Sequence, residues 1–396
     1  MKKIAIIGQG YVGLPLAIAA SGAGYKVIGI DNDKDKIADL NKGICGIEDL
    51  SNSELLASIN SGNYTAVSDE SCIGESEVVL VCVPTPLDEN HKPDLTILKS
   101  AVEDVSRYIK PGSLIIIEST VGPGTTRDVI LPLIEKVSKL SRSQFHLVFS
   151  PERIDPTNKS WNVLNTPKLV SGLTQESLEM AVNFYSKFIK TIVRCDSLEI
   201  AETAKLLENS FRLVNISFIN EVAIICDKLG INVREVIAAA STKPYGYMPF
   251  YPSIGVGGHC IPVDPIYLAE KARLINAPSL MIEVASKINN DMPAYFVGRA
   301  EEKLGGLKGK RVLVVGLSYK PNVADIRETP VKALIIGLQE KGADVQWHDD
   351  LVKEWNSEKS VELSSDFDLA IVATPHDYLD LIKLGNVPVI NTRGSN

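Results

Sequence analysis

Short apolar runs alternate with amphipathic segments through the first half of the chain. Helical spacing, with apolar residues recurring at three and four positions, marks residues 95–108 and 125–140. This alternation is typical of an α/β fold in which helices cover both faces of a parallel sheet. We therefore predict a doubly wound, Rossmann-like domain over residues 1–196. Its predicted strands are 3–7, 26–30, 78–83, 114–118, 146–149 and 168–171.

The pattern changes at residue 197, where a long helical stretch begins. Residues 197–229 contain no proline or glycine, and apolar side chains recur along one stripe. Such a stripe covers either a second subunit or the core of one large domain, and the pattern leaves both open. Further helical segments at 232–240 and 280–304 complete a central helical domain, 197–304. The stripe consists of Ala204, Leu207, Phe211, Val214, Phe218, Val222 and Ile225.

Strand and helix patterns return after residue 304. The order of strand, turn, helix, strand and acid resembles that of the first domain, but the turn carries a single glycine, Gly316. We predict a second Rossmann-like domain over residues 305–396 that binds a different nucleotide. Its predicted strands are 311–316, 344–348, 369–374 and 387–390, with a helix at 330–341.

The first strand ends in a dinucleotide fingerprint, Gly8-Gln9-Gly10-Tyr11-Val12-Gly13. The first glycine makes the turn, the second admits a pyrophosphate, and the third lets helix and strand pack closely. Asp31 ends the next strand, where an acid binds the ribose 2′-hydroxyl and repels a 2′-phosphate. The pattern therefore favours NAD over NADP, with FAD as the alternative.

A cysteine follows a glycine run in Gly255-Val256-Gly257-Gly258-His259-Cys260-Ile261-Pro262-Val263-Asp264-Pro265. Glycines let the backbone pass close to a ligand, and a thiol placed there can reach that ligand. A nicotinamide cofactor together with a cysteine nucleophile suggests oxidation to an acid through a thioester. The alternatives are an inert buried thiol for Cys260, a metal pair with His259 that lacks further ligands, and a turn-capping role for Asp264.

Polar residues also gather on one face of the long helix. Lys205, Asn209, Arg212 and Asn220 occur at offsets that place them near one face, which is either solvated or lines a pocket. A lysine there could stabilise an oxyanion at the reacting carbon. Other candidates follow strands, where α/β sheets bind ligands, or carry charge near the second sheet. They are Pro84-Thr85-Pro86, Ser119-Thr120, Ser150-Pro151-Glu152-Arg153, Lys320 and Arg327.

Composition narrows the class of protein. With 45% apolar and 23% charged residues, the 396-residue chain is typical of soluble globular proteins. A net charge of −8 without any basic block argues against a nucleic-acid partner. The six cysteines lack CxxC spacing, which disfavours a zinc site or a disulfide framework. No apolar run is long enough to span a membrane, so we expect a cytoplasmic protein with no bound metal.

Together these residues closely resemble the nucleotide-sugar 6-dehydrogenases, the family of UDP-glucose and UDP-N-acetylhexosamine dehydrogenases. The resemblance covers essentially the whole chain. It implies two Rossmann-like domains joined by a helical segment that forms a homodimer, and oxidation of a sugar C6 alcohol twice with two NAD+. Its motifs, in the family's order, are GQGYVG, CVPTP, EST, SPER, AKLLENSF, GVGGHCIPVDP, GLSYKPNVADIRETP and NTRG.

The resemblance also implies roles for individual residues. Cys260 is the expected nucleophile, Lys205 and Asn209 are expected to steady the oxyanion, and Asp264, Thr120 and Glu152 to order water and handle protons. The expected cofactor contacts are Gly8, Gly10, Tyr11, Val12, Gly13, Asp31, Lys36, Pro84, Thr85, Ser119, Thr120 and Arg327. The expected substrate contacts are Glu152, Arg153, Lys205, Asn209, Phe250, Tyr251, Ser253, Gly257, Lys320 and Arg393.

The sugar is suggested by departures from the glucose branch. Val263 and Asn215 stand where that branch usually carries a lysine and an arginine, so the chain looks nearer the N-acetylhexosamine branch. We expect UDP-N-acetylglucosamine as substrate and a product used in surface polysaccharide. Lys243 lies where relatives place an arginine donated across the dimer. The alternatives are a UDP-glucose 6-dehydrogenase, a catalytically silent nucleotide-sugar sensor and a β-hydroxyacid dehydrogenase.

Overall fold

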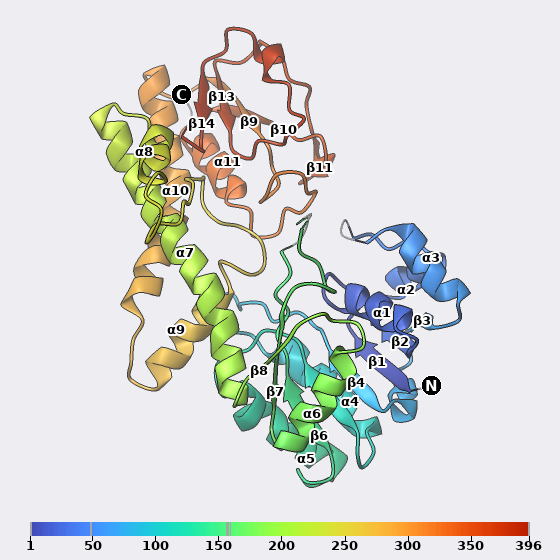
Figure 1. The fold of residues 1–396 in the computed structure, drawn as a ribbon. Helices are drawn as coiled ribbons and strands as arrows, with labels where there is room; N and C mark the ends of the chain where they lie inside the picture. Colours follow the sequence, from blue (N-terminus) through green and yellow to red (C-terminus); the bar gives the residue numbers. More distant parts are fainter. Residues whose placement is uncertain (1, 48–49, 156–157, 159, 395–396) are drawn as a thin grey trace. The chain divides into compact units, whose positions relative to one another are not determined.

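The computed structural model describes residues 2–47, 50–155, 158 and 160–394. The chain divides into two compact units, residues 1–207 and 208–396 (Figure 1). The helix α7 (Leu198–Leu229) runs through the boundary between them. Each unit contains its own sheet, as the two Rossmann-like patterns predict.

An eight-stranded sheet forms the centre of the first unit, in the order β3-β2-β1-β4-β5-β6-β7-β8. All neighbouring strands are parallel except β6 and β7, which are antiparallel. Parallel neighbours need a crossover, usually a helix, and the described residues between β6 and β7 form none. The prediction of a parallel sheet is therefore wrong for this one pair of strands, β6 and β7. The strands are β1 (Lys3–Ile7), β2 (Lys26–Ile30), β3 (Tyr64–Val67), β4 (Val78–Val81), β5 (Leu114–Ile117), β6 (His146–Phe149), β7 (Lys168–Gly172) and β8 (Ile192–Arg194).

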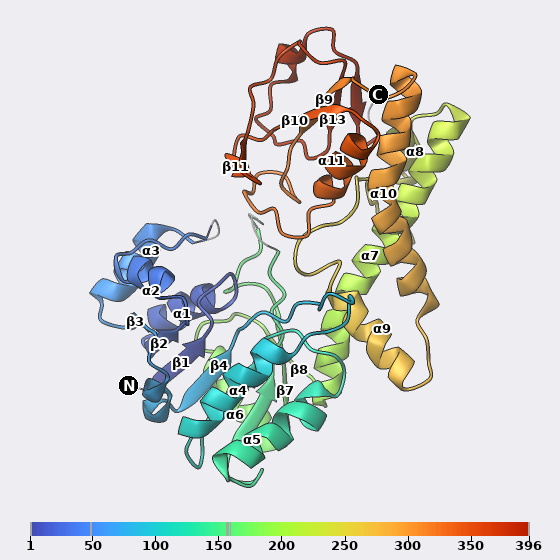
Figure 2. The ribbon, with the colours of Figure 1, turned by 180° about the vertical axis from the view of Figure 1, so that it is seen from behind.

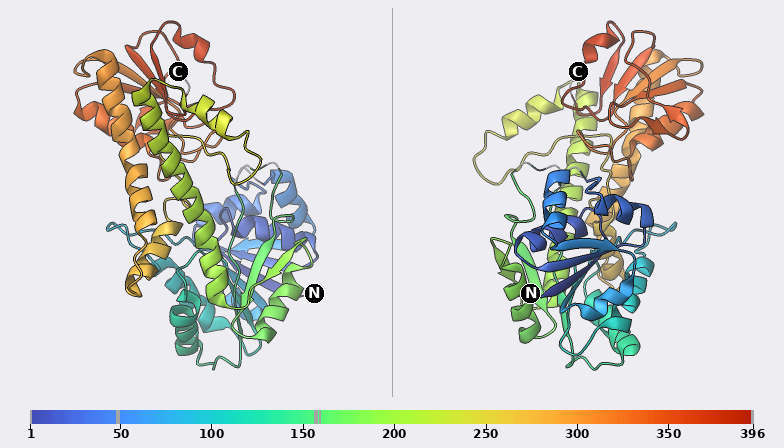
Figure 3. Two further views of the ribbon diagram at one scale, coloured as in Figure 1. Left: turned by 60° about the vertical axis from the view of Figure 1, so that its left-hand side comes forward. Right: turned by 90° about the vertical axis from the view of Figure 1, so that its right-hand side faces the viewer.

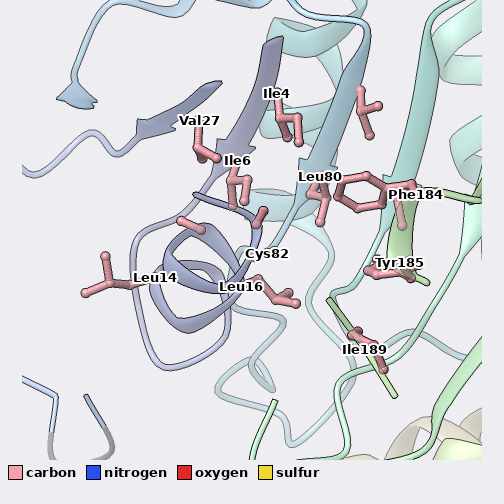
Figure 4. Close-up of a cluster of buried hydrophobic side chains, with 14 of the residues drawn as sticks. Ile4, Ile6, Leu14, Leu16, Val27, Leu80, Cys82, Phe184, Tyr185 and Ile189 are labelled. Carbon is pink, nitrogen blue, oxygen red and sulfur yellow. The ribbon is translucent and has the colours of Figure 1, made fainter. Parts of the chain in front are cut away.

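Helices cover both faces of this sheet because its strands are apolar on both sides. Ile4 and Ile6 of β1 belong to one buried cluster, which Figure 4 shows, whereas Ala5 between them belongs to another. This alternation along a strand separates two hydrophobic layers. The helical elements of the unit are α1 (Gly13–Gly22), α2 (Lys34–Asn41), α3 (Asn52–Asn60), η1 (Glu70–Glu75), α4 (Thr96–Tyr108), η2 (Thr126–Ile130), α5 (Leu131–Ser138) and α6 (Gln175–Tyr185).

The second unit combines helices with a smaller sheet. The long helix α7 runs beside α10 (Leu280–Leu304), as the left view of Figure 3 shows. Ser217 of α7 donates a hydrogen bond to the carbonyl oxygen of Ala285, at 2.7 Å, and Tyr295 donates one to Asp227, at 2.5 Å. Between them in sequence lie α8 (Val233–Ala240) and α9 (Asp264–Leu274).

The helix α9 is one that the sequence patterns missed. Its first turn contains Asp264 and Pro265, and proline is well tolerated there because its missing N–H would have no partner. Asp264 is therefore the first residue of a helix and does not cap a turn.

Four parallel strands form the second sheet, in the order β10-β9-β13-β14. The helix α11 (Val331–Glu340) packs on one face beside α10 (Figure 2). Among the described residues, no helix combines the length and apolar character needed to cross a membrane. The remaining elements are β9 (Arg311–Val315), β10 (Asp344–His348), β11 (Glu354–Trp355), β12 (Glu358–Lys359), β13 (Leu369–Val372), η3 (Leu381–Leu384) and β14 (Val389–Asn391).

Candidate active site

The glycine fingerprint lies between β1 and α1, where the order of the sheet changes direction. Gly8 has a φ of +88°, and a Cβ there would lie 2.6 Å from the carbonyl oxygen of Cys82. A Cβ on Gly13 would lie 1.8 Å from the Gly8 carbonyl oxygen. A Cβ on Gly10 would meet no heavy atom within 4 Å. The fold thus requires two of the glycines, and the third leaves open space of the kind that a dinucleotide pyrophosphate needs.

Asp31 faces this turn from the end of β2. Its carboxylate accepts hydrogen bonds from the Gln9 amide at 2.8 Å, the Lys36 ammonium at 3.1 Å and the Asp33 amide at 3.1 Å. Burial alone would raise the pKa of Asp31, but these donors lower it below its usual value. The buried carboxylate is therefore ionised at neutral pH, next to the residue that begins the glycine turn. Lys36, a predicted cofactor contact, reaches the site through Asp31.

The ends of β4 and β5 are tied together beside this turn. Ser119 donates a hydrogen bond from its hydroxyl to the carbonyl oxygen of Val83, at 2.7 Å. Thr85 and Ser119 are buried, Thr120 is half-buried, and Pro84 is exposed. Tyr11 and Val12 are half-buried in the glycine turn itself. These predicted cofactor contacts follow β1, β4 and β5, at the edge of the sheet where α/β folds bind ligands.

Glu152 and Arg153 follow β6 in the same unit. One oxygen of Glu152 accepts hydrogen bonds from the amides of Arg153, at 2.5 Å, and Ile154, at 2.6 Å. The Arg153 guanidinium donates to the carbonyl oxygen of Pro167, at 2.8 Å. Glu152, Arg153 and Lys168 also line one small cavity. Lys168 was missed by sequence analysis, because a lysine at the start of an apolar strand shows no sign that it is buried.

Lys205 occupies a buried position near the start of α7. One turn before it, the buried Glu202 accepts hydrogen bonds from the amides of Gly124, at 2.6 Å, and Thr126, at 2.9 Å. These amides follow Thr120 along the chain and begin the next helical segment, where free N–H groups attract a carboxylate. Glu202 thus fixes the Lys205 helix to the Thr120 loop, a role that its sequence position did not reveal.

Cys260 lies in the second unit, on the loop before α9, and it is exposed. The Asp264 amide donates a hydrogen bond to the Cys260 carbonyl oxygen, at 2.8 Å. The Asp264 carboxylate in turn accepts one from the Asn209 side-chain amide, at 2.6 Å, and both of these side chains are buried. The nucleophile candidate is therefore not a buried thiol, and the helix α7 holds its loop through a buried polar pair.

The polar face of α7 is only partly as predicted. The Asn220 side-chain oxygen Oδ1 accepts a hydrogen bond from the Ser253 amide, at 2.8 Å, so Asn209 and Asn220 both hold the loop that carries Cys260. Arg212 is exposed, whereas Lys205, Asn209 and Asn220 are buried, so this face is solvated at one position and covered at the others. An offset of seven residues turns Arg212 only about 20° from Lys205 around a helix of 3.6 residues per turn, so its exposure depends on what covers the helix there.

The glycines beside Cys260 are needed for a different reason from the one that the sequence suggested. A Cβ on Gly257 would lie 2.6 Å from the Glu328 carbonyl oxygen, and one on Gly258 would lie 2.7 Å from the Tyr319 ring. The Gly258 amide also donates to the Arg327 carbonyl oxygen, at 3.1 Å. These two glycines therefore make room for a second protein loop, residues 319–330.

That second loop carries Lys320 and Arg327. Lys320 is half-buried, and the exposed Arg327 guanidinium pairs with Asp325 at 2.6 Å. Burial, reinforced by Arg327, lowers the pKa of His259 below its ordinary value, so this ring is neutral at neutral pH. Among the described residues, no group of three or more histidine, cysteine or acidic side chains is arranged to hold a metal ion.

The other substrate candidates lie around α8 and the end of the chain. The Phe250 ring contacts Phe211 with 5.8 Å between centroids, and Arg234 lies 5.7 Å over the Tyr251 ring. Arg234 also donates to the carbonyl oxygen of Arg393, at 2.9 Å. This contact fixes the turn that carries Arg393. Lys243, farther along the same segment, lies 5.3 Å over the Tyr245 ring.

The second sheet repeats the geometry of the first. Gly316 has a φ of +86°, and a Cβ there would lie 2.0 Å from the carbonyl oxygen of Thr374, which follows the neighbouring strand β13. Asp349 ends β10 and accepts hydrogen bonds from the Leu317 and Ser318 amides, at 2.7 and 3.2 Å. His376 also pairs with Asp349, at 3.2 Å. Asp349 thus corresponds in position to Asp31, but its carboxylate binds groups of the protein itself.

The comparisons with known proteins agree with this arrangement. The UDP-glucose/GDP-mannose dehydrogenase family matches in three parts: its NAD binding domain at residues 2–189, its central domain at 199–291 and its UDP binding domain at 313–393. A UDP-N-acetyl-D-glucosamine 6-dehydrogenase from Pseudomonas aeruginosa is 37% identical over 94% of this chain and 87% of its own length. A UDP-N-acetyl-D-mannosamine dehydrogenase from Methanococcus maripaludis is 34% identical over 98% and 90%.

A solved structure is similar over its whole length. The UDP-D-ManNAc dehydrogenase from Pyrococcus horikoshii superposes with a TM-score of 0.90 at 30% identity, covering 99% of this chain and 95% of that one. Its fold matches both Rossmann-like sheets and the long helix. The chain therefore belongs to the UDP-glucose/GDP-mannose dehydrogenase family of NAD-dependent oxidoreductases.

Proposed function

We propose that the protein is a UDP-N-acetylhexosamine 6-dehydrogenase that oxidises the C6 hydroxymethyl group of UDP-N-acetylglucosamine to the carboxylate. The observation that carries this proposal is the exposed Cys260, on a loop anchored by the buried Asn209–Asp264 pair. A simple alcohol dehydrogenase has no use for such a thiol. Within the family, Val263 and Asn215 favour the N-acetylhexosamine branch over the glucose branch.

The overall reaction is RCH2OH + 2 NAD+ + H2O → RCOO− + 2 NADH + 3 H+. Bound NAD supplies the oxidising equivalents, and the open turn at Gly10 with ionised Asp31 suits its pyrophosphate and ribose. The full set of proposed cofactor residues is the one predicted from the sequence.

Once the alcohol has been oxidised to an aldehyde, different residues of the chain act in the steps that follow. The Cys260 thiolate adds to C6, a C–S bond forms, and the carbonyl electron pair moves onto oxygen to give a thiohemiacetal. Lys205 and Asn209 steady this oxyanion. The second oxidation restores the carbonyl as a thioester. Water then adds, the C–S bond breaks and the thiolate is regenerated, with Asp264, Glu152 and Thr120 ordering the water and accepting its protons.

The substrate is proposed to bind through the residues predicted from the sequence. In this proposal Lys320 and Arg393 bind its phosphates, while Phe250, Tyr251, Ser253 and Gly257 line the sugar-nucleotide site. The predicted segments keep their roles: residues 1–196 bind NAD, 197–304 carry the cysteine loop, and 305–396 bind UDP. We also propose that the enzyme works in the cytoplasm, where its thiol stays reduced, and that its product enters surface polysaccharide.

One experiment tests the activity and the sugar together. NADH formation is followed with UDP-glucose, UDP-GlcNAc, UDP-GalNAc and UDP-ManNAc, and NADH is counted per sugar consumed. We expect the highest kcat/KM with UDP-GlcNAc, two NADH per sugar and no free aldehyde. A higher kcat/KM with UDP-glucose would assign the enzyme to the glucose branch. One NADH per sugar, with accumulating aldehyde, would refute the mechanism through a thioester.

A matched variant tests the nucleophile. Cys260→Ala should abolish uronate formation while UDP-sugar and NAD still bind with nearly native affinity, because the thiol is needed for chemistry and not for binding. Cys226→Ala, which removes a buried thiol elsewhere in the unit, serves as the control and should retain activity. Full turnover by Cys260→Ala would contradict the proposal.

We further propose that the enzyme is a homodimer formed along α7. Its predicted apolar stripe is largely exposed in the single chain, with Leu207 and Phe218 each 61% exposed. Monomers rarely expose a continuous apolar stripe of this kind. Phe218→Lys should give a monomer in light scattering, whereas Ile382→Lys, at an exposed apolar residue of η3, should not. A Phe218→Lys dimer would place the interface elsewhere.

A further inference from the structure

A cluster of buried ionisable side chains lies behind Glu152 in the first unit and has no part in the chemistry above. It contains Glu118, which follows β5, Lys168, which begins β7, and Tyr185, which ends α6. Glu118 is 2% exposed, Lys168 5% and Tyr185 0%. Glu118 is the first residue of the EST motif, whose next two residues are candidate cofactor contacts.

The Lys168 ammonium is the centre of this cluster. It donates to Glu118 at 2.5 Å and to the carbonyl oxygen of Pro151 at 3.2 Å, and it lies 3.6 Å from the second oxygen of Glu152. Tyr185 donates a hydrogen bond to the other oxygen of Glu118. One ammonium therefore bridges two carboxylates that come from two different strand ends.

Glu152 is held from both sides as a result. Its first oxygen accepts the two backbone amides of Arg153 and Ile154, and its second faces Lys168. Its side chain is 15% exposed, so one part of the carboxylate remains open. A group fixed at one end and open at the other is what a reacting carboxylate needs, because its position costs no reorganisation during the reaction.

The charges of the cluster are consistent with Lys168 as the cation that holds both carboxylates. Burial raises the pKa of Glu118 to about 7, although the Lys168 ammonium opposes this increase. For Lys168, burial acts to lower the pKa, but the charges of Glu118 and Glu152 outweigh it, and the pKa is raised above its ordinary value. Lys168 therefore stays charged. The other ionisable groups that interact with it are Tyr185 and Cys82, and burial raises the pKa of each well above its ordinary value, so both are neutral.

We propose that Lys168 is a positioning residue for Glu152: anchored by Glu118, it holds the Glu152 carboxylate in place. This inference rests on the proposed function, because it presupposes that Glu152 takes part in the reaction. Lys168 itself touches neither substrate nor cofactor in this proposal.

Two variants test the proposal, because only one of them removes the Lys168 ammonium. The double variant Lys168→Met/Glu118→Gln removes the bridge without leaving a buried charge unpaired, which a single Lys168→Met would do. We expect kcat to fall by about tenfold or more with little change in KM for the UDP-sugar. The acid limb of the kcat–pH profile should move to higher pH by roughly half a unit or more, since a carboxylate that loses a neighbouring ammonium takes up its proton more readily.

Glu118→Gln alone should leave the same limb close to its native position. Burial raises the pKa of Glu118 to about 7, so this side chain is already uncharged over the acid limb, and glutamine keeps its shape. Tyr185→Phe, which alters the cluster on the side away from Glu152, should also leave the profile in place, and Lys168→Arg should restore much of the kcat. A purely structural role would not confine the shift to the variant that lacks the ammonium.

The outcomes separate the two proposals. An unmoved acid limb with native kcat in the double variant, or an equal shift in Glu118→Gln alone, would overturn the role of Lys168 while leaving the proposed function intact. If the double variant does not fold, Lys168→Gln is measured in its place, and an unmoved acid limb overturns the role. Full kcat in Glu152→Gln would instead contradict the proposed function itself.

Discussion

Replacing Asp31 by asparagine removes the negative charge that we propose faces the cofactor ribose, and it keeps the shape of the side chain. In the native protein this carboxylate is buried, ionised and fixed by the Gln9 and Asp33 amides and by Lys36. The asparagine carbonyl can still accept the Gln9 amide. We therefore expect Asp31→Asn to change cofactor selectivity more than folding.

The magnitude follows from two effects. A carboxylate and a phosphate charge 4 Å apart repel by about 4 kcal/mol at an effective dielectric constant near 20. Lys36, 3.1 Å from Asp31, offsets part of this repulsion, but its exposed side chain is screened by solvent. A hydrogen bond between the NAD 2′-hydroxyl and the carboxylate adds about 1.5–3 kcal/mol. Since 1.4 kcal/mol is a factor of ten, we expect NAD to be preferred over NADP by at least roughly a hundredfold.

The assay compares kcat/KM for the two cofactors at saturating UDP-sugar. Asp31→Asn should narrow the preference to within about tenfold, because Lys36 is left to attract the 2′-phosphate. Asp349→Asn is the matched control: it alters the corresponding acid of the second sheet and should lower stability without changing the ratio. Equal use of both cofactors by the native enzyme, or an unchanged ratio in Asp31→Asn, would show that Asp31 does not face the ribose.

Three further predictions follow from the same structure. Lys205→Ala should lower kcat by about a hundredfold with a smaller effect on KM, because removing one oxyanion donor costs about 3 kcal/mol; a change confined to KM would argue against this role. Asn209→Asp places a second buried carboxylate beside Asp264, so the pair should retain a proton to higher pH and move the acid limb of kcat upward; an identical pH profile would contradict the contact. Gly316→Ala should lower the melting temperature more than Gly309→Ala, since both have positive φ but only at Gly316 would the Cβ strike other backbone atoms, those of Thr374; equal losses would mean that backbone strain alone sets the cost.

The order of elements and the NAD site were readable from the sequence because their signals are local. Apolar periodicity gave the long helix to within one residue of its start, and the glycine fingerprint with Asp31 marked the cofactor turn. The roles of Cys260, Lys205 and Glu152 were suggested by resemblance, and they stay predictions until variants are measured. The reversal at β7 was missed because strand direction depends on the path of the connection, which local periodicity does not report.

What the sequence determined by itself is therefore most of the strands and long helices, the family motifs and the residue types available for chemistry, whereas β3, β8 and α9 were not predicted. The tertiary structure decided which polar residues meet. Lys168 lies far in sequence from both Glu118 and Glu152, and no local pattern distinguishes it from a solvated lysine, yet the sheet brings all three charges together in its interior. Likewise, the sequence suggested that the glycines before Cys260 make room for a ligand, whereas in the fold the 319–330 loop occupies that space. Burial and partner choice depend on contacts distant in sequence, so they are properties of the fold and not of any segment.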